Sequence, residues 1–101
     1  LSAIVEERDA TAEQRRIDEV NSGVYAFDYP ALARALSSLT ARNAQGEYYL
    51  TDTVAALGRA GLGTAVVRAD DHRELLGINT VEQLAEAARV RAELDAAGEG
   101  R

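Results

Sequence analysis

Short strand-like segments alternate with helical segments along this chain, and that alternation limits the folds it can adopt. Residues 2–7, 19–27 and 64–68 have the apolar residues and side-chain alternation of strands. In residues 19–27 both faces carry apolar groups, which is typical of a sheet covered on both sides. Helical patterns separate and follow these segments, so the sequence predicts an α/β layer structure. Three strands leave exposed edges, which leads us to expect that further strands are missing.

Capping and stop signals mark the expected helices. Two starts carry a capping box: Thr11 with Gln14, and Asn79 or Thr80 with Gln83. A third helix is expected to start at Asp28 or Tyr29, with Pro30 in its first turn. A fourth is expected to start at Thr51 or Asp52 and to stop at Gly61. A polar turn or short helix is expected over residues 70–77. Apolar spacing also predicts three buried faces. These are Leu32, Ala35, Leu36 and Leu39; Val54, Leu57 and Gly61; and Val81, Leu84, Ala85, Ala88 and Ala92.

Charge and composition argue against several classes of function. The net charge is −6, so no basic surface favours a nucleic acid as partner. Cysteine is absent, which excludes disulfides, thiolate metal sites and a cysteine nucleophile. No apolar run approaches the roughly 20 residues of a membrane span. The chain opens on a strand-like segment, which we interpret as the start of a fragment.

Residues 43–52, Asn-Ala-Gln-Gly-Glu-Tyr-Tyr-Leu-Thr-Asp, are the most unusual stretch of the chain. Polar groups surround two adjacent tyrosines, and a helical pattern starts immediately afterwards. Residues just ahead of a capped helix can line a pocket, because a rigid element fixes their direction. From the residues alone, a binding site and an ordinary loop leading into a helix both stay open.

Two polar residues lie inside predicted strands, where apolar residues are expected. Glu6 would need partners if buried, because desolvating an unpaired charge is costly. A pair of sugar hydroxyls is one such partner, and a solvated glutamate at a strand end is the alternative. Asn21 offers a ligand both donors and an acceptor. Gly23, on the same face, would allow a ligand to approach closely or would mark a bulge.

Three other patterns are interpreted as structural. Residues 61–64, Gly-Leu-Gly-Thr, lead into a predicted strand, whereas a phosphate loop leads into a helix, so they are expected to form a turn. His72 lies in a charged run and is expected to be solvated. Glu6, Glu7 and Asp9 could suggest a two-carboxylate glycosidase. Neighbouring strand residues point in opposite directions, so these carboxylates are not expected to converge.

Three stretches resemble the GlmU family of bifunctional N-acetylglucosamine-1-phosphate uridyltransferases and glucosamine-1-phosphate acetyltransferases, in the family's order and spacing. They are residues 4–11 (Ile-Val-Glu-Glu-Arg-Asp-Ala-Thr) with 19–24 (Glu-Val-Asn-Ser-Gly-Val), residues 43–52, and residues 77–80 (Gly-Ile-Asn-Thr). The resemblance implies that residues 1–101 are the second half of the uridyltransferase domain. That domain has a Rossmann-like nucleotidyltransferase fold with three layers and a mixed sheet. Nothing in the chain resembles the family's β-helix acetyltransferase domain.

The resemblance also implies a reaction and a set of site residues. The reaction is transfer of UMP from UTP to N-acetylglucosamine 1-phosphate, which gives UDP-N-acetylglucosamine and pyrophosphate for cell-wall precursor synthesis in the cytoplasm. The implied substrate-binding residues are Glu6, Asn21, Glu47, Tyr49, Thr51 and Asn79, and Asn79 would also coordinate Mg²⁺. The structural alternatives are a hydrogen-bond knot for residues 47–51 and a helix cap for Asn79. No residue of the chain is implied as catalytic.

The family's triphosphate loop, its uridine-reading residues and its metal-binding aspartate have no counterpart in this chain. We therefore expect the chain alone to be inactive, to need the amino-terminal half of the domain as a partner, and to derive from a homotrimeric parent. One alternative is a related nucleotidyltransferase acting on another sugar 1-phosphate. A second alternative is a non-catalytic acidic α/β interaction module.

Overall fold

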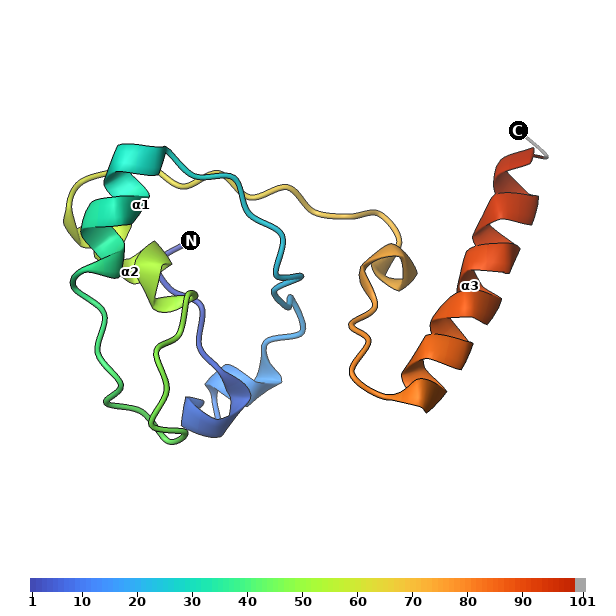
Figure 1. Ribbon diagram of the computed structural model, residues 1–101, viewed down its shortest axis with the longest axis horizontal. Coiled ribbons are helices and arrows are strands. Elements are labelled where there is room, and N and C mark those ends of the chain that lie inside the picture. Colours follow the sequence, from blue (N-terminus) through green and yellow to red (C-terminus); the bar gives the residue numbers. More distant parts are fainter. Residues whose placement is uncertain (100–101) are drawn as a thin grey trace. The chain divides into compact units, whose positions relative to one another are not determined.

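The computed structural model describes residues 1–99, which fall in two compact units (Figure 1). Unit 1 is Leu1–Val66, and unit 2 begins at Val67. Within residues 1–99 the regular elements are helices and short 3₁₀ turns, joined by extended and irregular segments, and no strand is formed. The predicted α/β fold with a mixed sheet is therefore wrong for the described chain.

The three segments predicted as strands explain this error. Their apolar residues are largely in solvent: Val20 is 83% exposed and Val67 is 95% exposed. An alternating pattern indicates which residues could form a strand, but a strand exists only when a neighbour takes up its backbone hydrogen bonds. Within residues 1–99 these segments form no such ladder, so they remain extended or irregular.

Both helices of unit 1 begin where their local signals predict, and the second also ends at the predicted stop, whereas the first ends before Leu39 of its predicted buried face. Helix α1 (Tyr29–Leu36) is capped by Asp28, whose carboxylate accepts from the Ala31 N–H at 3.1 Å. Helix α2 (Asp52–Arg59) is followed by Gly61 with a φ of 80°, a left-handed conformation that glycine adopts without strain. Two 3₁₀ turns precede them, η1 (Glu7–Asp9) and η2 (Gln14–Arg16).

The predicted capping box at the start of the chain is confirmed. The Thr11 N–H donates to Gln14 Oε1 at 2.8 Å, and the Gln14 N–H donates to Thr11 Oγ1 at 3.1 Å. This pair satisfies two backbone donors reciprocally. It supports the 3₁₀ turn η2, which lies within the short helical turn expected near residues 11–16.

The core of unit 1 is small and lies where α1 and α2 pack against each other. Its buried residues are Ala31, Ala35, Thr51, Thr53 and Val54. The side chain of Thr53 is 0% exposed, and its hydroxyl donates to the Leu50 carbonyl at 2.6 Å. The buried threonines therefore tie the end of residues 43–52 to the first turn of α2.

Unit 2 consists of η3 (His72–Leu75) and the long helix α3 (Val81–Glu99). The second capping box is confirmed, with Thr80 as its cap: Thr80 Oγ1 accepts from the Gln83 N–H at 3.1 Å. In return, Gln83 Oε1 accepts from the N–H groups of Asn79 and Thr80 at 2.7 and 3.1 Å. Over residues 1–99, no helix combines the length and apolar character needed to cross a membrane.

The predicted buried face of α3 is wrong. All five of its members are exposed in unit 2: Val81, Leu84, Ala85, Ala88 and Ala92. The helix instead buries Val90, with Ala87 and Leu94 half-buried, on the side that borders Leu76 and Ile78. Alanines occur around most of this helix, so apolar spacing alone does not distinguish one face from another.

Candidate functional site

Residues 43–52 form a loop that is closed by its first side chain. Asn43 Oδ1 accepts from the N–H groups of Gln45 and Glu47, both at 3.2 Å, and Asn43 Nδ2 donates to the Glu47 carbonyl at 2.5 Å. Gly46 lies inside this ring with a φ of 65°, a conformation that disfavours residues with a Cβ. These hydrogen bonds therefore fix the backbone conformation of the loop just before the two tyrosines.

Two acidic side chains of the first segment hold this loop. The Thr51 hydroxyl donates to Glu6 Oε1 at 3.2 Å. The Tyr49 hydroxyl donates to Asp9 Oδ2 at 3.0 Å, and the Ala44 N–H donates to Asp9 Oδ1 at 2.7 Å. In a 3₁₀ turn, residues three apart lie on the same side. Since η1 spans Glu7–Asp9 with Glu6 as its cap, Glu6 and Asp9 both face the loop.

These contacts correct two expectations about local geometry. Residues 2–7 were expected to be a strand that points neighbouring carboxylates apart, but the 3₁₀ turn brings Glu6 and Asp9 onto one loop. Thr51 is the N-cap of α2, yet its side chain makes no capping hydrogen bond. Its buried hydroxyl donates to Glu6 instead. The side chain that the local pattern predicted as a helix cap therefore makes a tertiary contact.

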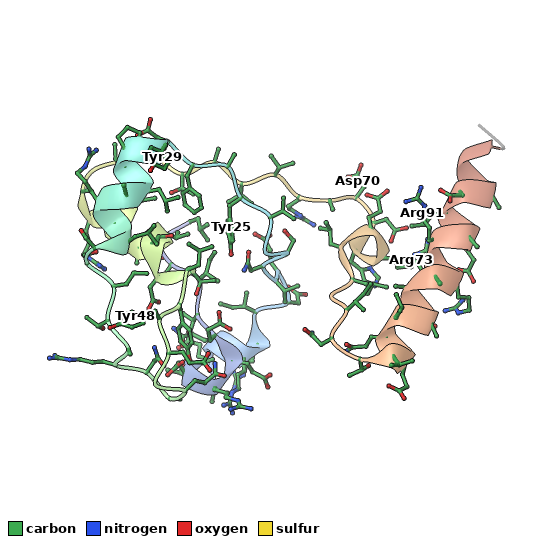
Figure 2. The ribbon with its side chains drawn as sticks, in the orientation of Figure 1. Tyr25, Tyr29, Tyr48, Asp70, Arg73 and Arg91 are labelled. Atoms are coloured by element: carbon green, nitrogen blue, oxygen red, sulfur yellow. The ribbon has the colours of Figure 1, made fainter. Side chains whose placement is uncertain are left out.

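Tyr49 is the half-buried aromatic group of this cluster, whereas its neighbour Tyr48 is 72% exposed. Figure 2 labels Tyr48 among the side chains of unit 1. Burial raises the pKa of the Tyr49 phenol, and the hydrogen bond and negative charge of Asp9 raise it further. Gln45 Nε2, which donates to the phenol oxygen at 2.8 Å, lowers the same pKa in part. Tyr49 is therefore protonated at neutral pH, donates to Asp9 and accepts from Gln45.

A cavity of about 240 Å³ lies beside this cluster. Its lining combines polar and apolar groups of unit 1: Ala3, Ile4, Val5, Glu6, Asp9, Arg42, Asn43, Tyr49, Asp52 and Ala55. Arg42 is the only cation among them. The volume is below the roughly 300–1,000 Å³ of most small-molecule pockets, so the space suits a group about the size of one sugar ring.

Three of the predicted site residues come together within unit 1. Glu6, Tyr49 and Thr51 belong to the cluster just described. Glu47 contributes its backbone to the Asn43 ring, while its side chain is exposed and does not line the cavity. Asn79 is exposed in unit 2 and donates its backbone N–H to Gln83.

Asn21 is exposed and engaged in a local turn of unit 1. Its Oδ1 accepts from the Gly23 N–H at 3.2 Å, and its Nδ2 donates to the Tyr25 hydroxyl at 2.6 Å. Gly23 has a φ of 81°, so the glycine serves the turn. The amide of Asn21 is thus occupied by neighbours in sequence, and it does not border the cavity.

Sequence reasoning missed the two side chains that organise the loop. Asp9 was considered only within an acidic run and within the family-like stretch of residues 4–11, and Asn43 only as the first residue of a motif. The spacing of three between Glu6 and Asp9 was a usable signal, because a 3₁₀ turn aligns such residues. Asn43 followed by Gly46 was a second signal, since an asparagine readily accepts from N–H groups a few residues on.

Within residues 1–99, no three or more histidine, cysteine, aspartate or glutamate side chains are grouped as a metal site would need. The exposed amide of Asn79 is one neutral oxygen donor. Mg²⁺ is usually held by one or two carboxylates together with phosphates and waters. The described part of this chain therefore does not fit a complete Mg²⁺ site by itself.

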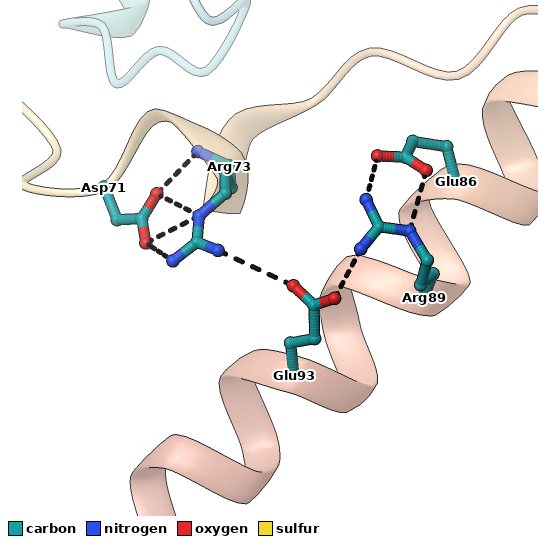
Figure 3. Close-up of polar contacts among 5 residues, drawn as sticks. All are labelled: Asp71, Arg73, Glu86, Arg89 and Glu93. Carbon is teal, nitrogen blue, oxygen red and sulfur yellow. Dashed lines mark hydrogen bonds and ion pairs between the residues drawn. The ribbon is translucent and has the colours of Figure 1, made fainter.

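Unit 2 contains a chain of ion pairs that joins η3 to α3 (Figure 3). Arg73 lies 2.6 Å from Asp71 and 3.7 Å from Glu93, and Arg89 pairs with both Glu93 and Glu86. The hydrogen bonds from Arg73 lower the pKa of the Asp71 carboxyl to about 2. A cavity of about 490 Å³ in unit 2 is lined in part by Arg73. Arg73 and Arg91 on its lining are already paired with carboxylates, so we interpret the network as structural.

Most of this chain is similar to segments of known bacterial proteins. It is 52% identical over 90 residues to the bifunctional protein GlmU of Streptomyces griseus, a match that covers 89% of this chain and 19% of the relative. It is 48% identical over 87 residues to that of Acetivibrio thermocellus (86% and 19%) and 47% identical over 90 residues to that of Corynebacterium diphtheriae (89% and 19%). No protein-family model matches the chain. The resemblance to the GlmU family is thus confirmed, and the chain spans about 19% of these relatives' length.

Proposed function

We propose that this chain, like the GlmU segment to which it is similar, serves the sugar side of an enzyme that transfers UMP from UTP to N-acetylglucosamine 1-phosphate. The products would be UDP-N-acetylglucosamine and pyrophosphate. The observation that carries the proposal is the cluster of Glu6, Tyr49 and Thr51 beside a cavity of about 240 Å³. The family resemblance implies a substrate-binding role for all three residues.

The chemistry of the cavity supports a sugar ligand. A carboxylate accepts hydrogen bonds through both oxygens, and the contact of Glu6 with Thr51 uses Oε1. Sugar hydroxyls are the donors that suit such an acceptor. The ring of Tyr49 offers apolar area with a polar tip. Ile4 and Ala55 on the lining would suit the methyl group of an acetamide.

The remaining predicted residues enter this proposal as further contacts to the sugar nucleotide. Asn21, Glu47 and Asn79 are exposed, so each is accessible to a ligand. Asn79 would give one amide oxygen to Mg²⁺. The other ligands of the ion would come from substrate phosphates and from residues outside this chain, since the described residues do not supply them.

The proposal assigns this chain a positioning role. Phosphoryl transfer depends mainly on alignment and on neutralising charge at the phosphates, and it needs no covalent side chain. Glu6, Tyr49 and Thr51 would orient the sugar phosphate for attack on the α-phosphate of UTP. Groups that hold the triphosphate and the uridine would come from the preceding part of such a domain. The chain alone is therefore expected to release no pyrophosphate.

Binding of N-acetylglucosamine 1-phosphate to the full 101-residue chain tests the sugar role directly. We expect the ligand to shift the NMR signals of Glu6, Tyr49 and Thr51, and to bind in preference to glucose 1-phosphate. Glu6→Gln should weaken binding by about tenfold or more, because it removes a charged acceptor. Glu7→Gln is the matched control, since Glu7 is exposed and does not line the cavity.

The alternatives make different forecasts for the same titration. Preference for glucose 1-phosphate would favour a related nucleotidyltransferase with another sugar. An interaction module predicts no shift of these signals and no change in melting temperature with sugar nucleotide, since only a ligand of the native state raises stability. Equal weakening by the two glutamate variants would count against the cavity as the binding site.

A second assay tests the proposed reaction. This chain would be mixed with the part of the Streptomyces griseus relative that precedes the matched segment, and UDP-N-acetylglucosamine formation would be measured. Activity that Asn79→Ala abolishes would support both the reaction and the metal role of Asn79. A folded mixture without activity would contradict the uridyltransferase proposal.

A further inference from the structure

Asp9 makes two hydrogen bonds to residues far away in the sequence, one with each carboxylate oxygen. Its Oδ1 accepts from the Ala44 N–H at 2.7 Å, and its Oδ2 accepts from the Tyr49 hydroxyl at 3.0 Å. These partners are 35 and 40 residues further along the chain. Neither the family resemblance nor the predicted set of site residues assigns Asp9 a role.

We infer that Asp9 is a positioning residue that fixes the start of the 43–52 loop and the direction of the Tyr49 side chain toward the cavity. The loop is then held on η1 at both ends, by Asp9 at Ala44 and by Glu6 at Thr51. Without Asp9, the hydrogen bonds of Asn43 would close the loop internally but would not attach its start to the first segment.

The chemistry of the two contacts requires a carboxylate at position 9. An ionised aspartate is an acceptor only, so it serves two donors at once. The phenol of Tyr49 has one hydrogen to donate, and its oxygen already accepts from Gln45 at 2.8 Å. An asparagine of the same shape would present an N–H group to one of the two donors, and one contact would be lost. Asp9→Asn thus removes one acceptor while it keeps the size and shape of the side chain.

Titration of the tyrosines in the full chain tests this inference without any ligand. With ¹³Cζ-labelled tyrosine and Tyr49→Phe for assignment, the pKa of Tyr49 should lie above the ordinary tyrosine value of 10.0. In Asp9→Asn the pKa of Tyr49 should fall, because the hydrogen bond and the charge that raise it are removed. Asp18→Asn, at an exposed site, should leave it unchanged. An unchanged Tyr49 pKa in Asp9→Asn would overturn the inference.

A second measurement needs no variant and so does not depend on Asp9→Asn folding. The Ala44 N–H should be protected from hydrogen exchange in the unaltered chain, because Asp9 accepts from it. Exchange of this amide at the rate of an unstructured peptide would contradict the inference. In Tyr49→Phe the protection of Ala44 should persist, since that contact does not involve the phenol.

The consequence for binding rests on the proposed function. If the unaltered chain binds N-acetylglucosamine 1-phosphate, Asp9→Asn should weaken binding by about tenfold, and equal binding would overturn the positioning role. If the unaltered chain does not bind this sugar phosphate, the proposed function fails. The Tyr49 titration and the Ala44 exchange then decide the inference by themselves.

Discussion

Unit 1 and unit 2 are stabilised by different kinds of contact. Unit 1 buries residues of α1, α2 and the intervening loop, and that loop donates hydrogen bonds to Glu6 and Asp9 of the first segment. Unit 2 buries Val90 and otherwise joins η3 to α3 through exposed ion pairs. Exposed ion pairs contribute little and are screened by salt, whereas hydrogen bonds from neutral donors are less affected.

This difference teaches where directed chemistry can be supported. A ligand site needs side chains with fixed directions, which buried or half-buried contacts provide. Such contacts surround Tyr49 and Thr51 in unit 1. The candidate residue of unit 2, Asn79, lies exposed just before a capped helix. Four predictions test the contrast.

The largest effect is expected from Val54→Ala in the core of unit 1. Removing two buried methyl groups should lower the free energy of unfolding of unit 1 by about 2 kcal/mol. All four tyrosines lie at positions 25–49, so tyrosine fluorescence in a urea titration reports unit 1 alone. Val20→Ala, at a side chain that is 83% exposed, is the control and should change stability by less than about 0.5 kcal/mol. Equal losses in the two variants would show that this core is not formed.

A smaller effect is expected at the start of α3. Thr80→Ala removes the side-chain acceptor for the Gln83 N–H, which should destabilise the helix by about 1 kcal/mol. Circular dichroism at 222 nm would follow the loss of helix on heating. Asn79→Ala is the matched control, because Asn79 donates to Gln83 through its backbone and the substitution keeps that bond. A greater loss of helix in Asn79→Ala than in Thr80→Ala would show that Asn79 is the N-cap.

Acid should loosen unit 2 in a defined range of pH. Arg73 lowers the pKa of Asp71 from 3.8 to about 2, so the ionised carboxylate favours the folded state. Its contribution is present above pH about 4 and is lost as pH falls toward 2. The amide signals of His72–Leu75 should shift over that interval. They should not do so in Asp71→Asn, and an Asp70→Asn control should behave like the unaltered chain.

The smallest effect is expected from salt. At 1 M NaCl the Debye length is about 3 Å, so the ion pairs of Arg73 and Arg89 should weaken. Hydrogen exchange in η3 should accelerate by less than about fivefold, as exposed ion pairs are weak. The protection of Ala44 in unit 1 should stay the same. Faster hydrogen exchange both in η3 and at Ala44 would show that the two units do not differ in their sensitivity to salt.

Local signals predicted the helix boundaries well. Asp28 and Thr80 cap helices as predicted, and Gly61 follows the end of α2, because these effects involve residues within a few positions of one another. The site was predicted in part. Tyr49 and Thr51 were identified from the motif, but their contacts with Asp9 and Glu6 depend on a 3₁₀ turn some 40 residues away, at the end of a segment that was predicted to be a strand.

The sequence by itself determined the caps at Asp28 and Thr80, the turns at glycine and the resemblance to GlmU, since each depends on residues in a short stretch. Only the tertiary structure decided whether apolar segments become strands, which face of α3 is buried and what Thr51 contacts. The physical reason is the same in all three cases. A backbone ladder, a buried face and a hydroxyl partner each require a second part of the chain, and the pattern of one segment does not say which part that is.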